Sequence, residues 1–297
     1  MQPRCLSRFS GHKYLGRNWI IILTKPLHQE NRPRSKGSSP VADGFEEAGT
    51  PQLNGRMPGL GVYDLGQVNY SVDLLRRDEQ ERSHITNELR LIKGEYGIKS
   101  CTVLEVGCGL GQNLEVFRSD NNVLGIEGLA SAVGEACSRG LTVVQGDLES
   151  ELDMRAETVD WLLCLDVLEH LERPLNLMLE MRKVLRIGGR AILNVPNHFD
   201  LSGRLKLLLG HNLDVHKFFP ESHDWDNPHL RFFTHAGILQ MVEASGFRLV
   251  EDRSGHFCSF PKRDLLQPMG FGFALHYLAR KKPSMFAGGF FLIVEKT

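Results

Sequence analysis

The chain has 297 residues, enough for one large domain with an appendage, and 41% of them are hydrophobic, as is ordinary for a globular protein. A formal net charge of −1 gives no reason to expect a nucleic acid or an anionic membrane as a partner. No apolar run reaches the roughly 20 residues that a membrane span needs. The six cysteines form neither a C-x-x-C pair nor a zinc spacing, so we expect reduced thiols, a cytoplasmic location and no metal site.

The first 62 residues are predicted to form a tail of little order. Residues 1–40 hold eight Lys or Arg and one acidic residue, and residues 24–62 are rich in Pro, Gly and Ser without hydrophobic periodicity. The basic start has some features of a transit peptide, although Met57 is an alternative start of translation. We therefore place the folded domain at residues 63–297, beginning with a helix within 70–96.

Short apolar strands alternate with helices over the rest of the chain. The pattern predicts strands at 102–106, 122–127, 141–145, 159–165, 189–195, 247–253 and 289–296, with helices at 111–119, 129–138, 172–185 and 235–245. Strands separated by helices imply a mainly parallel sheet covered on both faces. Right-handed crossovers then give an α/β fold: a doubly wound, Rossmann-like three-layer sandwich with seven strands.

The end of the first strand carries Glu105 and three glycines at alternate positions, Gly107, Gly109 and Gly111. Glycine lets the backbone bend sharply and approach a ligand closely, because no Cβ intervenes. Gln112 stands where a dinucleotide fingerprint G-x-G-x-x-G would need its third glycine. The backbone amides of this turn can face a polar ligand, although a simple turn between strand and helix is the alternative.

Two further strand ends carry acidic residues, and ligands of such sheets lie beyond the carboxyl ends of the strands. Glu127 ends the second strand about 20 residues past the glycines, where a carboxylate can accept hydrogen bonds from two ribose hydroxyls. This position suits any cofactor that contains ribose. Asp147 follows the third strand and is either a ligand residue or a plain turn residue.

Three segments in this order resemble the class I S-adenosylmethionine-dependent methyltransferases. They are E-x-G-x-G-x-G at 105–111, the strand end LDVLEHL at 165–171, and H-x-R-x-F-T at 229–234. The resemblance is closest to the ubiquinone-biosynthesis O-methyltransferases and the MetW-like group. It implies an antiparallel last strand. Ile187 departs from the family, which usually has proline in the turn before the fifth strand.

S-adenosylmethionine is the cofactor that this resemblance implies. Its predicted binding residues are Glu105, Gly107, Cys108, Gly109, Gly111, Glu127, Asp147, Leu148, Leu165 and Asp166. The implied reaction is methyl transfer to a small-molecule or glycan acceptor, with oxygen as the expected accepting atom. A MetW-like protein that binds the cofactor and modulates another enzyme is the alternative. The chain shows no signal for an oligomeric state.

A hydroxyl acceptor would need a base, and His170, His198 and His229 are the candidates because imidazole titrates near neutral pH. His170 could equally have a structural role. His229 and Arg231 either face the substrate or merely brace the loop. Residues 198–231 form an insertion that we expect to act as a lid over the substrate. Four histidines within 211–229 fit no zinc pattern, which again predicts no metal. Thr234 is predicted to cap the helix that follows.

Overall fold

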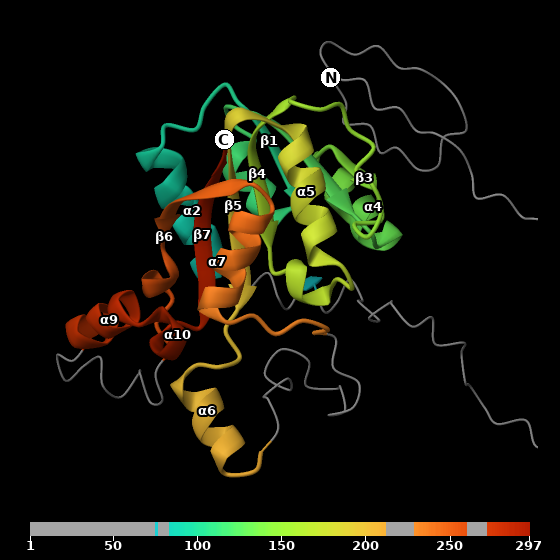
Figure 1. The fold of residues 1–297 in the computed structure, drawn as a ribbon. Helices are drawn as coiled ribbons and strands as arrows, with labels where there is room; N and C mark the ends of the chain where they lie inside the picture. Colours follow the sequence, from blue (N-terminus) through green and yellow to red (C-terminus); the bar gives the residue numbers. More distant parts are fainter. Residues whose placement is uncertain (1–74, 77–82, 212–228, 260–271) are drawn as a thin grey trace, which may run out of the picture. The chain divides into compact units, whose positions relative to one another are not determined.

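The computed structural model describes residues 75–76, 83–211, 229–259 and 272–297 (Figure 1). The predicted tail of residues 1–62 lies outside the described residues, as do residues 212–228 of the predicted lid. In the part of the chain that is described, no helix is both long and apolar enough to cross a bilayer.

A seven-stranded sheet forms the centre of the domain, in the order β3-β2-β1-β4-β5-β7-β6. The first five strands pair in parallel, whereas β7 pairs antiparallel with both β5 and β6. The strands are β1 Thr102–Val106, β2 Asn122–Glu127, β3 Val143–Gln145, β4 Val159–Leu165, β5 Leu185–Pro196, β6 Phe247–Asp252 and β7 Gly289–Lys296. The predicted fold class, with its antiparallel last strand, is confirmed.

Helices connect and cover these strands (Figure 1). The helices described are α2 Ser83–Glu95, α3 Gln112–Phe117, α4 Ala130–Ser138, α5 Pro174–Val184, α6 Leu201–Leu208, α7 His235–Ala244, α9 Gly272–Lys281 and α10 Pro283–Phe286, with 3-10 turns η1 Leu168–His170 and η2 Ser254–His256. Thr234 caps α7 as predicted, because its Oγ1 accepts a hydrogen bond from the Gly237 amide at 3.0 Å. Asp200 caps α6 in the same way, through the Gly203 amide at 2.7 Å.

Side chains of β4 alternate between two hydrophobic clusters, as the pleat of a strand requires. Leu162 and Cys164 face the cluster that contains apolar residues of α5 and α7. Trp161, Leu163 and Leu165 face the cluster that contains those of α2. The sheet is thus the middle of three layers. The carboxyl ends of β1, β2, β4 and β5, which run in parallel, meet at one edge of it.

Two predictions about the second half of the chain are wrong. Strand β5 begins at Leu185 and not at residue 189, because Leu185 already pairs with Val159 ahead of a register shift. The expected turn therefore lies inside the strand, where Gly188 takes a φ of 74° and Ile187 is 75% exposed. The stretch before β7, for which the sequence predicted no helix, contains α9 and α10. Among the fully described side chains of α9, only Ala279 is buried.

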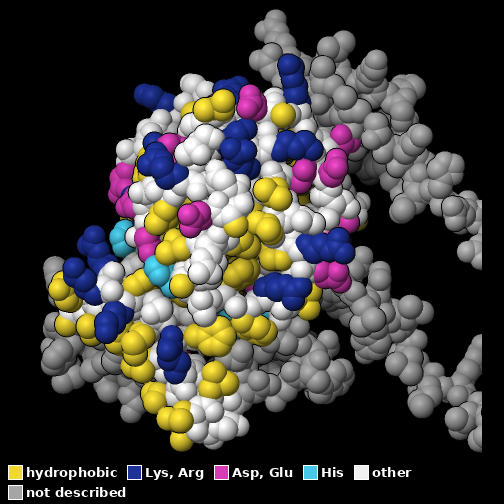
Figure 2. Space-filling view, in the orientation of Figure 1, with side chains coloured by type: hydrophobic (Ala, Val, Ile, Leu, Met, Phe, Trp, Pro, Cys, Tyr) yellow, Lys and Arg dark blue, Asp and Glu magenta, His cyan; other side chains and the backbone are white. Residues whose placement is uncertain are grey.

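Helix α6 belongs to the predicted lid and projects from the end of β5 (Figure 1). None of its residues is buried. Hydrophobic side chains gather over this helix in the space-filling view, with basic side chains beside them (Figure 2). They include Leu205, Leu207, Leu208 and Leu209, which are between 41% and 82% exposed. Helix α6 therefore adds no residue to the core, and polar contacts hold its start: Arg204 donates to the Phe199 carbonyl and Ser259 to the Asp200 carboxylate. The role of the insertion as a lid stays a prediction.

Candidate functional site

The glycine turn between β1 and α3 is fixed by backbone hydrogen bonds and by close packing. The amides of Gly107 and Cys108 both donate to the Ile126 carbonyl, at 2.8 and 3.2 Å. Gly107 and Gly111 have φ angles of 67° and 83°. A Cβ on Gly107 would lie 2.5 Å from Val167 Cγ2. These positions therefore need glycine for both backbone conformation and space.

Gly109 differs, because a Cβ there would meet nothing closer than Leu75 Cδ2 at 3.6 Å. Residues 75–76 are helical and reach the glycine turn from the N-terminal side. Arg76 forms an ion pair with Glu135 of α4, with 2.9 Å between Nη2 and Oε2. A Cβ at Gly109 would thus be in ordinary van der Waals contact with Leu75, which belongs to a segment paired with α4.

Glu127 is oriented by two backbone amides. Its Oε2 accepts from Gly109 at 2.8 Å, and its Oε1 accepts from Leu129 at 2.8 Å. Each carboxylate oxygen can accept a further hydrogen bond. The side chain is therefore held at the end of β2 with acceptor capacity for two vicinal hydroxyls, as the predicted ribose contact requires.

Glu105 is 2% exposed and lies at the end of β1. Its Oε1 accepts a hydrogen bond from Asn113 Nδ2 at 2.9 Å. Sequence reasoning missed Asn113. The only signal for it was an amide side chain in the first turn of the helix that follows the glycines.

Asp147 is exposed and closes a turn after β3. Its carboxylate accepts from the Glu149 amide at 2.9 Å and from Ser150 Oγ at 2.8 Å. This is the turn role that the sequence left open, and it leaves lone pairs for a further donor. Leu148 is partly buried against the core. The predicted adenine contacts of both residues stay predictions.

Leu165 and Asp166 stand at the end of β4. Leu165 is 5% exposed and packs in the cluster on the α2 side, so its side chain serves the core. Asp166 takes a φ of 54°, a left-handed conformation that is uncommon outside glycine. Asn194 of β5 holds it there, because Asn194 Nδ2 donates to Asp166 Oδ1 at 2.6 Å and the Asp166 amide donates to the Asn194 carbonyl at 2.9 Å.

Carboxylates follow one another along this edge of the sheet. Burial raises the pKa of the Cys108 thiol well above its usual value, and the charges of Glu105 and Glu127 raise it further. Burial likewise raises the pKa of Cys164, with added effects from Glu169, Asp166 and Glu105. Both thiols therefore stay protonated at neutral pH. The acids around them form a negative rim that favours a cationic ligand.

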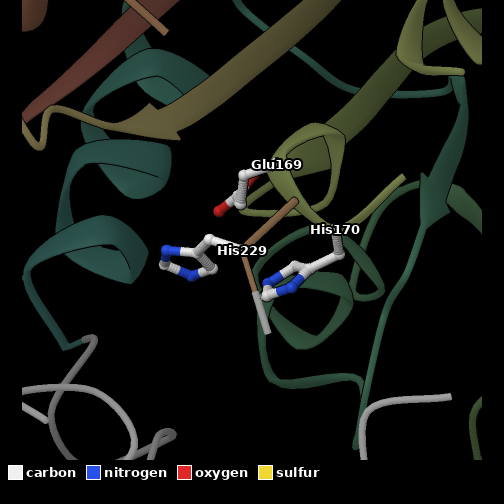
Figure 3. A group of neighbouring side chains, drawn as sticks. All are labelled: Glu169, His170 and His229. Atoms are coloured by element: carbon white, nitrogen blue, oxygen red, sulfur yellow. The ribbon is translucent and has the colours of Figure 1, made fainter. Parts of the chain in front are cut away.

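A cluster of histidines lies beside Glu169, one of these acids, and Figure 3 shows two of them, His170 and His229. The Glu169 carbonyl, in η1, accepts from the amides of Leu230 and Arg231 at 2.8 and 2.9 Å, which brings His229 against η1. The His170 and His229 ring centroids are 4.8 Å apart. Arg231 also donates to the Glu172 carbonyl, so Arg231 braces the loop.

His198 completes the cluster from the segment after β5. Its Nε2 lies 2.7 Å from His229 Nδ1, within hydrogen-bonding distance, and its ring packs edge-on against Phe232 at 4.9 Å. Burial lowers the pKa of His198 to about 4, against smaller opposing effects of the Pro196 backbone and the Asp200 carboxylate. His198 is therefore neutral at pH 7. Of the two facing nitrogens, one carries the hydrogen and the other accepts it.

Glu169, His170 and His229 each offer one potential ligand atom, and these atoms lie within 4.8 Å of one another. Glu169 is 1% and His229 6% exposed. Such a trio could hold a metal ion, although spacing along the chain predicted no metal site. Sequence separation hid this grouping, because His229 follows His170 by 59 positions.

The comparisons with known proteins agree with this geometry. The ubiquinone biosynthesis O-methyltransferase of Vibrio cholerae is 30% identical over 177 residues, which cover 54% of this chain and 67% of that protein. The enzyme of the same name from Actinobacillus pleuropneumoniae is 27% identical over 192 residues, covering 59% and 78%. A solved structure of a putative methyltransferase from Bacillus halodurans has the same fold, with a TM-score of 0.50 at 20% identity, over 71% of this chain and 98% of that one.

The fold, the glycine turn and the acids at the strand ends define a class I S-adenosylmethionine-dependent methyltransferase. The donor set fits this cofactor: Glu127 has acceptors for the ribose hydroxyls, and the negative rim matches a sulfonium and an ammonium group. A family model described as methionine biosynthesis protein MetW matches residues 88–259, and the chain belongs to the MetW family.

Proposed function

We propose that this methyltransferase acts on a hydroxyl group of a small aromatic molecule, with His229 as the base. The observation that carries the proposal is the pair of buried rings, His198 and His229, at 2.7 Å beside the rim of acids. The names of the relatives, which are O-methyltransferases of ubiquinone biosynthesis, support an oxygen atom of a phenolic ring over a glycan.

The cofactor supplies a methyl group that is already activated for transfer. The protein then has to align the acceptor oxygen and exclude water, and alignment of this kind can supply on the order of 7–11 kcal/mol. His229 is 6% exposed, so a proton that it accepts is shielded from bulk water. The neutral His198 fixes the orientation of the His229 ring through their shared hydrogen bond. This pairing favours His229 over His170 as the base, since His170 is only partly buried.

The test is transfer of a deuterated methyl group to an acceptor panel, followed by mass spectrometry. The panel holds catechols and hydroquinones with and without an isoprenoid tail, hydroxylated sugars, and amine and thiol compounds. We expect products on phenolic oxygen, with a loss of about 10²-fold or more in His229→Ala, as for removal of a general base. His276→Ala, on the distant α9, serves as the matched control. Transfer only to sugars, nitrogen or sulfur would contradict the proposal.

Cofactor binding without turnover on any acceptor would favour the alternative, a protein that modulates another enzyme. The same assay, repeated after treatment with a metal chelator, tests whether the reaction needs a metal ion. We expect activity to persist after chelation; loss that a divalent cation restores would contradict this and point to Glu169, His170 and His229. We also propose a cytoplasmic location, which suits the thiols of Cys101, Cys108 and Cys164, each in the part of the chain that the structure describes.

A further inference from the structure

A chain of two hydrogen bonds joins helix α2 to the buried carboxylate of Glu105. Asn113 Nδ2 donates to Glu105 Oε1 at 2.9 Å, and Thr86 Oγ1 donates to Asn113 Oδ1 at 3.3 Å. Thr86 is 3% and Glu105 2% exposed. A carboxylate only accepts hydrogen bonds, so Asn113 has to present its amino group to Glu105. The Thr86 hydroxyl, placed at the amide oxygen, holds the Asn113 side chain in this orientation.

The cofactor cradle consists of the glycine turn at 107–111 and the ends of β2 and β4. Glu105 lies at its centre, because β1 pairs with β2 on one side and with β4 on the other. Its charge acts on Cys108, within the glycine turn, and on Cys164 near the end of β4. On the β2 side, Glu127 is bound to the turn and offers acceptors for neutral hydroxyls. On the β4 side, Glu105 shares the rim with Asp166 and Glu169. A cationic group of a bound ligand would therefore be favoured on the β4 side.

We propose that Asn113 is a positioning residue for the amino-acid half of the cofactor. It holds the Glu105 carboxylate in the orientation that meets the ligand's ammonium group. Thr86 makes α2, which precedes the first strand, part of the same arrangement. The inference concerns cofactor binding alone, so it is independent of which acceptor is methylated.

Two ligands separate this role from a merely structural one. S-adenosylhomocysteine and 5′-methylthioadenosine share the adenosine and the sulfur, but only the first carries the amino-acid group. Both are titrated calorimetrically into the full chain without any acceptor. We expect Asn113→Ala to weaken S-adenosylhomocysteine about tenfold, as for loss of a hydrogen bond to a charged group. Its affinity for 5′-methylthioadenosine should stay within about twofold.

Thr86→Val is the second variant. It should also weaken S-adenosylhomocysteine relative to 5′-methylthioadenosine, by a smaller factor than Asn113→Ala. Asn87→Ala is the control, because Asn87 is exposed on the same helix and bonds only to Arg90 in the contacts described. Equal weakening of both ligands, or an unchanged affinity for S-adenosylhomocysteine, would overturn the proposal. If Asn113→Ala does not fold, Thr86→Val decides by the same two criteria. A failure to find an acceptor leaves these binding ratios unaffected.

Discussion

Gly111 shows how a single position constrains the cofactor cradle. Its φ is 83°, and a Cβ there would lie 2.1 Å from Leu141 Cδ1. We expect Gly111→Ala to lower the free energy of unfolding by about 3 kcal/mol, the sum of left-handed strain and overpacking. Gly97→Ala is the matched control, because Gly97 has a φ of 59° with nothing within 4 Å. Gly97→Ala should lower the free energy of unfolding only by the left-handed strain, about 1 kcal/mol. Urea denaturation measures both, and equal losses would contradict the overlap.

His198 gives a second prediction for a single residue, from its pKa of about 4. An unfolded histidine titrates near 6.5, so below that pH the unfolded chain binds the extra proton first. His198 thus contributes its full stability above pH 6.5, and this contribution is lost as the pH falls to about 4. The loss is on the order of 3 kcal/mol. His198→Phe removes the titrating group, so its stability should fall less between pH 6.5 and 4 in denaturant titrations. If the free energy of unfolding depended on pH in the same way in both proteins, His198 would not be buried in its neutral form.

At the scale of helices and strands, hydrophobic periodicity located most of the fold. The predicted bounds of β1, β2, β4 and β7 agree with the structure because each strand concentrates apolar residues that are mostly buried. β3 begins at Val143, two residues later than predicted, since Leu141 packs beneath Gly111 and does not pair with β2. α9 was missed, and among its fully described side chains only Ala279 is buried. Periodicity thus predicts elements that enter the main core and fails for those that lie outside it.

The cap of α7 gives a prediction at this scale. Thr234 Oγ1 satisfies the Gly237 amide, and α7 buries Ile238 and Val242 against the sheet. Because the helix is part of the core, we expect Thr234→Ala to lower the free energy of unfolding by about 1 kcal/mol. Thr234→Ser keeps the hydroxyl and should retain most of the stability that the cap contributes. Both are measured by thermal denaturation, and a loss as large in Thr234→Ser would assign the effect to the methyl group instead.

At the scale of the whole molecule, topology assembled what sequence spacing could not. His170, His198 and His229 lie in η1, after β5 and before α7, and only the fold brings their rings together. That Glu105, Glu127 and Asp166 share one edge could be predicted, since strand ends of a doubly wound sheet meet there, whereas their contacts with the cofactor stay predictions. The partners that orient them, Asn113 and Asn194, could not, because each contact depends on side-chain packing between separate elements.

Ligand binding should therefore be visible as stability of the entire domain. A ligand that binds only the folded state stabilises it by about 2.7 kcal/mol at a concentration 100 times its Kd. We expect S-adenosylhomocysteine to raise the melting temperature, whereas NAD should not, because Gln112 breaks the dinucleotide fingerprint.

Glu127→Gln tests whether stabilisation by the ligand depends on the predicted contact between Glu127 and the ribose. The variant keeps one side-chain oxygen for the turn amides but loses the second acceptor and the charge. Its unliganded melting temperature should fall modestly, and its shift with S-adenosylhomocysteine should shrink well below that of the unaltered chain. Glu149→Gln, whose carboxylate binds the amides at the start of α5, makes the same chemical change outside the cradle. A full shift in Glu127→Gln, or a shift lost equally in Glu149→Gln, would rule out Glu127 as the ribose ligand.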